Sequence, residues 1–197
     1  AVSLKSGGYN SLEMDLSTGK RGSRQNHIAD LLKQLTGAED ALVVNNNAAA
    51  LYLCLSALVH KKNVIVSRGE AVEIGGNFRI PEIASSGLTS LKEVGTTNRT
   101  YINDYAEAAD LNTGAFLKVH TSNFKVLGFT HGASITELVE LSKRRNIPLI
   151  FDIGSGSLLK TELFGLSHEP MPQEAVKAGV DITLQSATVS SRNRRAR

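Results

Sequence analysis

The sequence predicts an α/β fold: a mostly parallel β-sheet with helices on both of its faces. Short apolar segments of strand length alternate with segments of helical periodicity, which is the order of elements in βαβ units. Several of the apolar segments end directly on polar or charged residues, as strands do where a parallel sheet borders a ligand crevice. The chain of 197 residues, 41% of them hydrophobic and 21% charged, is long enough to bury one substantial core and a small appendage.

The N-terminal part of the chain carries a basic loop and then a helix. Residues 1–8 have no start signal, so we read them as the continuation of a longer sequence. The loop at residues 19–24, GKRGSR, contains Arg21 and Arg24, and two guanidinium groups there can hold an anion. A merely solvated loop is the other reading that these residues allow. After the loop, apolar residues recur at helical spacing until Gly37, at positions Ile28, Leu31, Leu32 and Leu35.

Residues 41–50, ALVVNNNAAA, are the segment around which we expect the fold to be organised. Four apolar residues predict a buried strand at 41–44, which three asparagines end before three alanines open a helix. Such a joint points unpaired backbone N–H groups and a helix N-terminus at one place, where an anion, usually a phosphate, binds. Because strand-turn-helix joints are common in α/β proteins, a purely structural role is the alternative.

A second joint of the same kind lies at residues 146–157, NIPLIFDIGSGS. Its apolar strand ends on Asp152, and the flexible segment 154–156, Gly-Ser-Gly, follows. In an open parallel sheet the ligand lies beyond the carboxyl ends of the strands, so Asp152 and the asparagine-rich turn should face one crevice. A phosphate site and a separate carboxylate in one crevice suggest a phosphorylated cofactor that also carries a basic nitrogen.

Further strands and a helix are predicted between and after these joints. The strands are expected at residues 63–67, 91–94, 115–119 and 181–186. A helix is expected after the capping box that Ser134 opens and Glu137 completes. For His120, at the end of one strand, a hydrogen-bonded structural role and a catalytic role are both open. Four charged residues crowd the segment after residues 63–67 and form either the wall of a site or a surface ion-pair cluster: Arg68, Glu70, Glu73 and Arg79.

Composition argues against several classes of protein. The formal charge is +3, but without residues 186–197 the chain has 18 basic and 19 acidic residues, so its body is not basic in the manner of nucleic-acid-binding proteins. Nothing resembles a membrane span or a secretory signal, and the five histidines show no metal-ligand spacing. The one cysteine, Cys54, lies in an apolar run where a buried structural role is expected. We therefore expect a cytoplasmic protein with no metal and no membrane partner.

These motifs together resemble the bacterial L-seryl-tRNA(Sec) selenium transferases, or selenocysteine synthases. The likeness runs nearly unbroken from about Tyr9 to Ser186, through GKRGSR, LTGAEDALVVNNNAAA, VIVSRGEAVEIGGNFRIPE, EVGTTNRT, KVHTSN, DIGSGSL and EPMPQEA. The resemblance implies a pyridoxal 5'-phosphate (PLP) enzyme with the aspartate aminotransferase-like fold. It also implies that residues 1–185 are the PLP-binding large domain of such an enzyme, incomplete at both ends.

The resemblance implies roles for individual residues. Those that resemble cofactor-binding positions are Asn46, Asn47, Ala48, Asn123 and Asp152. The first three resemble the cradle of the PLP phosphate, and Asp152 resembles the carboxylate that pairs with the pyridinium nitrogen. That pairing keeps the ring protonated and able to accept electrons from the α-carbon of the substrate. Asn123 is similar in placement to the asparagine that binds the phenolic oxygen of the ring.

For full-length members, the resemblance implies conversion of L-seryl-tRNA(Sec) to selenocysteinyl-tRNA(Sec). Selenophosphate supplies selenium to a PLP-bound dehydroalanyl intermediate, and either Arg21 or Arg24 resembles a ligand for this donor or for the terminal nucleotide of the tRNA. Full-length members are expected to be homo-oligomers that grip tRNA through an N-terminal helical domain. Two alternatives stay open: a PLP-dependent lyase or aminotransferase of the same fold acting on a small amino acid or amino sugar, and a non-catalytic PLP-fold binding protein.

The sequence departs from the family pattern near its C-terminus. After the last strand the family reads Ser-Gly-Asp-Lys-Leu-Leu, in which the lysine forms the Schiff base with PLP and the neighbouring aspartate assists. Here Val189 stands at the lysine position and Thr188 at the aspartate position, so neither catalytic side chain is present. We expect residues 186–197, rich in serine and arginine, to be a disordered tail that arises from a shifted reading frame, a truncation or an artefact. Because it lacks this lysine, the chain is predicted to be inactive in selenium transfer.

Overall fold

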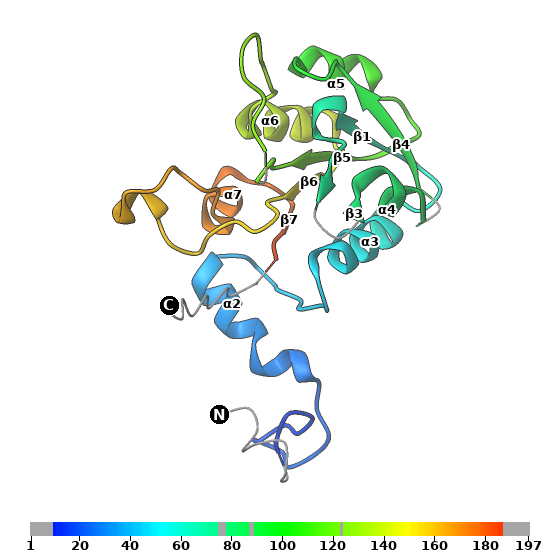
Figure 1. The fold of residues 1–197 in the computed structure, drawn as a ribbon. Helices are drawn as coiled ribbons and strands as arrows, with labels where there is room; N and C mark the ends of the chain where they lie inside the picture. The colour runs from blue at the N-terminus through cyan, green and yellow to red at the C-terminus, as the bar shows by residue number, and fades with distance from the viewer. Residues whose placement is uncertain (1–9, 75–77, 87–88, 123, 187–197) are drawn as a thin grey trace. The chain divides into compact units, whose positions relative to one another are not determined.

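The computed structural model describes residues 10–74, 78–86, 89–122 and 124–186. The chain divides into two compact units, Ala1–Val43 and Val44–Arg197, and each is described by itself. The larger unit contains a five-stranded sheet in the order β4-β1-β5-β6-β7, with every neighbouring pair parallel (Figure 1). Its strands are β1 (Asn63–Ser67), β4 (Ser90–Val94), β5 (Thr113–Val119), β6 (Leu149–Asp152) and β7 (Ile182–Leu184). The predicted parallel sheet is confirmed.

Helices cover both faces of this sheet, as predicted. One face carries α3 (Asn47–Leu58) and α4 (Ile80–Ser86), and the other carries α5 (Ile102–Ala108), α6 (Ile135–Arg145) and α7 (Pro172–Ala178) (Figure 1). Because successive side chains of a strand point to opposite faces, each central strand contributes to both cores. In β1, Val64 and Val66 pack on the side of α3 and α4, whereas Ile65 packs on the side of α5 and α6.

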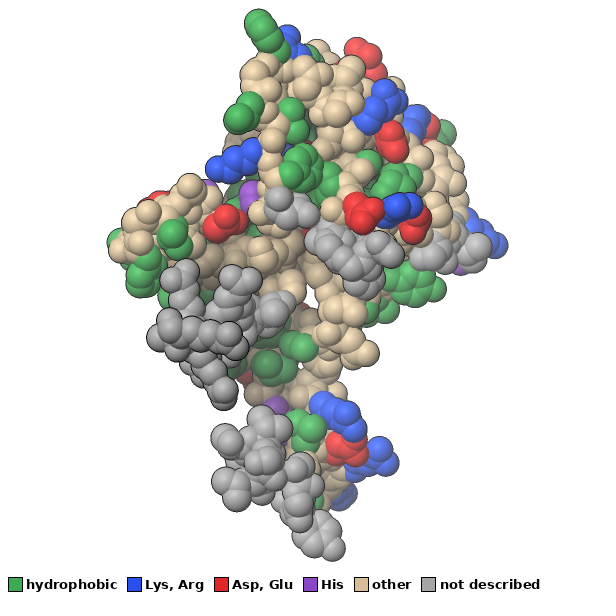
Figure 2. Space-filling view, viewed as in Figure 1, with side chains coloured by type: hydrophobic (Ala, Val, Ile, Leu, Met, Phe, Trp, Pro, Cys, Tyr) green, Lys and Arg blue, Asp and Glu red, His purple; other side chains and the backbone are tan. Residues whose placement is uncertain are grey.

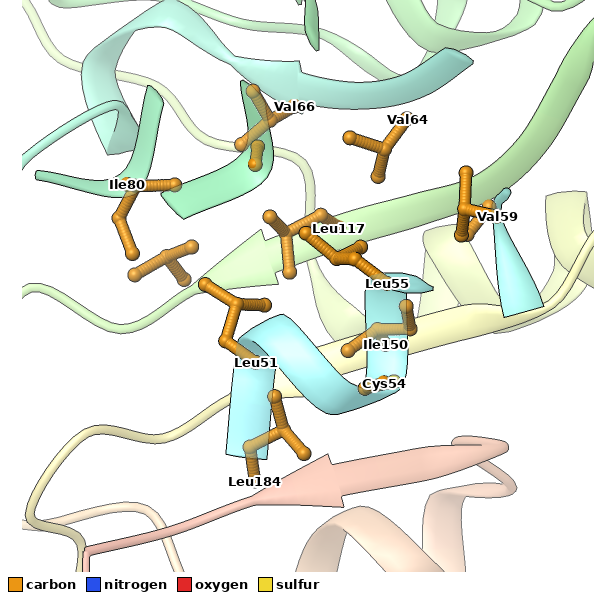
Figure 3. Packing of buried hydrophobic residues seen from close by; sticks show 13 residues of the cluster. Leu51, Cys54, Leu55, Val59, Val64, Val66, Ile80, Leu117, Ile150 and Leu184 are labelled. Atoms are coloured by element: carbon orange, nitrogen blue, oxygen red, sulfur yellow. The ribbon is translucent and has the colours of Figure 1, made fainter. Parts of the chain in front are cut away.

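The core between α3 and the sheet lies directly behind the carboxyl edge of the strands. Leu51 and Leu55 of α3 point toward Leu117 of β5 and Ile150 of β6, and none of the four side chains is more than 1% exposed (Figure 3). Burying each such side chain stabilises the fold by about 1.5–3 kcal/mol. Cys54 is buried in the same cluster, and this burial raises the pKa of its thiol to about 11. The expectation of a structural cysteine is confirmed.

The predicted elements agree closely with the observed ones. β1 has the predicted bounds, and β4 and β5 begin one and two residues earlier than expected. The capping box at the start of α6 is present: Glu137 Oε2 accepts the Ser134 N–H at 2.8 Å, and Ser134 Oγ accepts the Glu137 N–H at 3.3 Å. α6 ends at Arg145, and the residue that caps it, Asn146, adopts a left-handed conformation with φ of 53°.

The prediction of a buried strand at residues 41–44 is wrong. No strand forms there, and the side chains of Leu42 and Val43 are 61% and 41% exposed. The backbone of Val43 instead pairs with the side-chain amide of Gln25, whose Nε2 donates to the Val43 carbonyl at 2.8 Å and whose Oε1 accepts the Val43 N–H at 2.9 Å. A glutamine side chain therefore satisfies the groups that a neighbouring strand would have paired.

The smaller unit contains the helix predicted after the basic loop. A 3-10 turn, η1 (Arg24–His27), leads into α2 (Ala29–Thr36), and Gly37 ends the helix in a left-handed conformation with φ of 77°. Upstream, Met14 and Arg21 form an antiparallel bridge. The helix and its glycine stop are confirmed.

Short elements complete the larger unit. β2 (Glu73–Ile74) and β3 (Phe78–Arg79) form a two-stranded antiparallel sheet, and the 3-10 turns η2 (Arg68–Glu70) and η3 (Thr161–Phe164) follow β1 and β6 respectively. Among the described residues, no helix combines the length and the apolar character needed to cross a bilayer.

Candidate functional site

A pocket of about 250 Å³ opens at the carboxyl edge of the parallel sheet. Its apolar wall comes from Leu51 of α3 and from Ile80 and Ile83 of α4. The rest of its lining comes from the N-terminus of α3 and from the segments at the ends of β5, β6 and β7: Asn46, Asn47, Ala48, Ser122, Asp152, Gly154, Ser155 and Ser186. Ser186, the first residue of the tail that was expected to be disordered, is placed here, and its N–H donates to the Gly154 carbonyl at 2.7 Å. This is the edge at which ligands bind in open α/β sheets.

The structure brings the asparagine-rich turn and Asp152 together. Asn47 Nδ2 donates a hydrogen bond of 2.7 Å to Asp152 Oδ1, although the two residues are 105 positions apart in the sequence. Asn47 is the first residue of α3, and Asp152 is the last residue of β6. The single crevice expected for these two segments is therefore observed.

Asp152 is a buried carboxylate with one oxygen unpaired. Its side chain is 1% exposed, and Oδ1 accepts a second hydrogen bond, of 2.9 Å, from the N–H of Gly154. Within the described part of the chain, Asp152 Oδ2 and Asn47 Oδ1 are buried and have no hydrogen-bond partner. Burial raises the pKa of Asp152, while the bonds from Asn47 and Gly154 oppose that rise. A buried acceptor of this kind is costly unless a donor meets it.

Beside Asp152 lies the N-terminus of α3. Asn46 is its N-cap, with Oδ1 accepting the Ala49 N–H at 2.8 Å, and its carbonyl accepts the Ala50 N–H at 3.1 Å. The N–H groups of Asn47 and Ala48 precede the first intrahelical bond, so they have no partner within the helix. A helix of 12 residues also places the positive end of its dipole here. The backbone N–H groups of Asn47 and Ala48 are therefore donors that this end can offer an anion.

The loop after β6 depends on glycine. Gly154 has φ of +69°, and this turn brings its N–H back onto Asp152 Oδ1. A Cβ at Gly154 would lie 3.2 Å from Ser122 Oγ, and one at Gly156, where φ is +47°, would lie 2.5 Å from Ile153 Cγ2. The loop therefore keeps its close approach to Ser122 and to Ile153 only without side chains at these positions.

Three of the predicted site residues lie outside the described residues: Asn123, Thr188 and Val189. Arg21 and Arg24 lie in the smaller unit, and both pair with the carboxylate of Glu13 there. The Arg24 Nε donates to Glu13 Oε1 at 2.9 Å, and the two guanidinium groups lower the pKa of Glu13, Arg24 having the larger effect. The sequence reasoning missed Glu13, which precedes the basic loop without any distinguishing pattern.

The four charged residues after β1 form ion pairs and do not line the pocket. Arg68 pairs with Glu93 at 3.2 Å, Arg79 pairs with Glu73 at 2.8 Å and with Glu82 at 3.0 Å, and Glu70 pairs with Lys118. On the face of the larger unit drawn in Figure 2, acidic and basic side chains accordingly lie next to one another. The pairs of Arg68 and Arg79 agree with the surface ion-pair reading, whereas the pair of Glu70 with Lys118 is largely buried.

His120 follows β5 and contacts the site through its backbone. Its N–H donates to the Asp152 carbonyl at 2.8 Å, and its Nε2 lies 3.4 Å from Glu169 Oε2. The sequence reasoning missed the apolar wall. Ile80 and Ile83 are spaced for one face of a helix, which is the signal that would have indicated the apolar wall.

Comparison with known proteins identifies the family. A sequence model of L-seryl-tRNA selenium transferase matches residues 1–188. The chain belongs to the L-seryl-tRNA selenium transferase family. The L-seryl-tRNA(Sec) selenium transferase of Alkaliphilus metalliredigens is 58% identical over 175 residues, which cover 89% of this chain and 38% of that protein. That of Carboxydothermus hydrogenoformans is 57% identical over 182 residues, covering 92% of this chain and 39% of the relative.

Solved structures with a similar fold include those of several lyases. D-glucosaminate-6-phosphate ammonia-lyase superposes with a TM-score of 0.65 at 22% identity, covering 80% of this chain and 42% of that one. Cystathionine gamma-lyase of Lactobacillus plantarum superposes with a TM-score of 0.60 at 17% identity, covering 89% of this chain and 42% of that one. An O-acetylhomoserine (thiol)-lyase of Campylobacter jejuni superposes with a TM-score of 0.58 at 18% identity, covering 82% of this chain and 35% of that one. Its structure contains N'-pyridoxyl-lysine-5'-monophosphate. The chain therefore shares the fold of these enzymes, and L-seryl-tRNA selenium transferase is a PLP-dependent transferase family.

The chain spans less than two fifths of the length of these selenium transferases. The matched segment contains the sheet, the helices on both of its faces and the pocket at its carboxyl edge.

Proposed function

We propose that this chain is the PLP-binding large domain, over residues 1–185, of an enzyme that converts L-seryl-tRNA(Sec) to selenocysteinyl-tRNA(Sec) with selenophosphate. The observation that carries the proposal is the buried Asp152 Oδ2, which has no partner in the described structure and lies in a pocket beside the N-terminus of α3. One group that satisfies both features is a phosphorylated ring with a protonated nitrogen.

The residues of the pocket fit PLP. The backbone N–H groups of Asn47 and Ala48 would hold the phosphate, and Asp152 Oδ2 would accept a hydrogen bond from the ring nitrogen. Asn123 would bind the phenolic oxygen. When bound, the protonated ring withdraws electrons from the α-carbon of an amino-acid substrate. Asn47 supports this by donating to Oδ1, which favours the charged form of Asp152 that the ring requires.

Covalent attachment of PLP is a separate question. By resemblance Val189 stands at the position of the Schiff-base lysine and Thr188 at that of the assisting aspartate, and a valine offers no amine. We therefore infer that this chain holds PLP without a covalent bond and does not catalyse selenium transfer. Lys118, the lysine on β5, is engaged in an ion pair with Glu70, which supports a structural role for it.

The proposed partners are those of the full-length family: seryl-tRNA(Sec), selenophosphate and further copies of the chain in a homo-oligomer. Arg21 and Arg24 are the proposed ligands for the selenium donor or for the end of the tRNA. Because both arginines pair with Glu13, an anion at this loop would compete with that carboxylate.

The proposal is tested by titrating the chain with PLP and following the absorbance of the bound cofactor. Asp152→Asn removes the charge that faces the ring nitrogen. A hydrogen bond to a charged group contributes about 1.5–3 kcal/mol, so the variant should bind PLP about 10- to 150-fold more weakly. The matched control is Asp181→Asn, which changes a carboxylate that accepts the Leu149 N–H at 2.8 Å, at the opposite end of β6.

Two results would contradict the proposal. One is equal PLP affinity for the wild type and Asp152→Asn. The other concerns the covalent bond: borohydride reduction followed by peptide mass analysis should find no lysine adduct, and a stoichiometric adduct together with turnover would refute the inactive reading.

A further inference from the structure

The carboxyl end of β5 extends beyond the strand that neighbours it on one side. β1 and β5 pair as far as Val66 and Leu117, after which the chain leaves β1 and enters η2. On its other side β5 stays paired with β6 through Val119 and Asp152. The last part of β5 therefore has a strand on one side only.

The N–H of Val119 points to the side that β1 has left. Backbone N–H groups of a strand alternate between its two neighbours, and the next one, of His120, donates to the Asp152 carbonyl on the β6 side at 2.8 Å. Val119 is 2% exposed, so water does not reach its N–H freely. An unpaired donor at this depth would be costly.

Glu70 supplies the missing acceptor. Its Oε2 accepts the Val119 N–H at 3.0 Å, from the 3-10 turn that directly follows β1. The residue is 7% exposed, and its other oxygen, Oε1, pairs with Lys118 Nζ. The Lys118 side chain is 17% exposed, so the pair is largely withdrawn from solvent and each charge compensates the other.

We propose that Glu70 is a positioning residue for the cofactor site. Past the end of β1, its carboxylate takes the place of a strand backbone by accepting the Val119 N–H, and this contact fixes the end of β5. That segment presents Ser122 to the pocket and ties His120 to the backbone of Asp152. Glu70 does not itself line the pocket, so it acts through β5. The effect on PLP rests on the proposed function, whereas the effect on β5 does not.

Two substitutions separate the hydrogen bond from the charge. Glu70→Gln keeps an oxygen that can accept from Val119 and removes the charge that faces Lys118. Glu70→Asp keeps the charge and, being one methylene shorter, withdraws the acceptor from Val119. Asp181→Ala is the control, because it removes the acceptor of the Leu149 N–H at the amino end of β6 and leaves the site edge unchanged.

The full chain and the three variants are compared in two measurements: hydrogen exchange of the Val119 and His120 amides by NMR, and PLP affinity. Losing a buried hydrogen bond worth about 1–3 kcal/mol raises the equilibrium constant for its opening by about 5- to 150-fold. In Glu70→Asp the Val119 amide should therefore exchange at least about fivefold faster than in the wild type, and PLP should bind more weakly. Glu70→Gln leaves Lys118 without its counter-charge and should lower the melting temperature, but because it keeps the acceptor of the Val119 N–H, local exchange of that amide and PLP affinity should stay within about threefold of the wild type. Asp181→Ala should unfold at a lower temperature without a change in PLP affinity.

The outcomes are distinguishable. If Glu70→Asp protects Val119 as well as the wild type does, or if Glu70→Gln is the more impaired of the two variants, the positioning role is overturned. Equal loss of PLP affinity in Asp181→Ala and Glu70→Asp would also overturn it, because general destabilisation would then be the cause. If the wild type binds no PLP, the proposed function fails, and the exchange of Val119 still decides the role of Glu70.

Discussion

Asn47→Ala tests how the two halves of the pocket depend on each other. The substitution removes the 2.7 Å hydrogen bond from Asn47 Nδ2 to the buried Asp152 Oδ1 and leaves the bond from the Gly154 N–H. A hydrogen bond to a charged group contributes about 1.5–3 kcal/mol, so the free energy of unfolding at neutral pH should fall by this amount. For a chain of this length that lowers the melting temperature by about 3–12 °C.

The pH dependence of this loss has a definite sign. Burial raises the pKa of Asp152 in the folded chain above the pKa of an aspartate in the unfolded chain, which is about 4. The wild type therefore loses stability as the pH rises from the unfolded pKa through the folded pKa. The bond from Asn47 favours the charged form, and its removal raises the folded pKa further. The cost of Asn47→Ala should therefore be largest above the folded pKa and smallest in acid.

The assay is thermal unfolding of the cofactor-free chain, followed by circular dichroism at several pH values, with Asn46→Ala as the control. Asn46 caps α3 through the Ala49 N–H, which does not titrate, so its loss should cost about 1 kcal/mol at every pH in the range. The reasoning would be refuted if the cost of Asn47→Ala were independent of pH, or if it followed the control.

Three further predictions concern the fold around the site. Tyr105→Phe removes the buried hydroxyl that accepts the Ser67 N–H at 2.9 Å, and urea unfolding should show a loss of about 1–3 kcal/mol; a loss under about 0.5 kcal/mol would contradict it. Leu55→Ala opens a cavity between α3 and the sheet and should cost about 2–5 kcal/mol in the same assay, whereas Leu111→Ala, at a fully exposed leucine, should cost almost nothing. His168 lies between Glu162, at 2.7 Å, and Glu174, at 3.2 Å, and its hydrogen bond to Glu162 raises its pKa most. Its contribution to stability is therefore full below the unfolded histidine pKa, about 6.5, and is lost as the pH rises through the folded pKa; His168→Gln should remove that dependence, and an NMR titration of the ring with no upward shift would contradict it.

The sheet could be predicted from sequence because its strands are short apolar runs with clear ends. Sequence reasoning also predicted that the asparagine-rich turn and Asp152 would share a crevice, and they do, but the N-terminus of α3 brings Asn47 there and the expected strand at 41–44 does not. An apolar run alone does not say whether a strand partner exists, and this is why residues 41–44 were mispredicted. The backbone of Val43 is satisfied by the side chain of Gln25, 18 positions away, and no periodicity signals such a contact.

Glu70 shows a second limit of the sequence. Its charge marked the segment after β1, but its contact depends on β1 stopping short of the end of β5. The relative lengths of two strands that are distant in the sequence follow from their pairing register, which is a property of the tertiary structure. The role of Glu70 therefore becomes visible only once the sheet is assembled.

The bond between Asn47 and Asp152 has a consequence for the order in which the molecule acquires its properties. It joins the beginning of the larger unit to its fourth sheet strand in sequence order, and β1, β4 and β5 all lie between the two residues in the sequence. Contacts that close so long a loop form late during folding. On the proposed function, a nascent chain would therefore gain its PLP site only after β6 had been synthesised and had joined β5, so cofactor binding would report an assembled sheet.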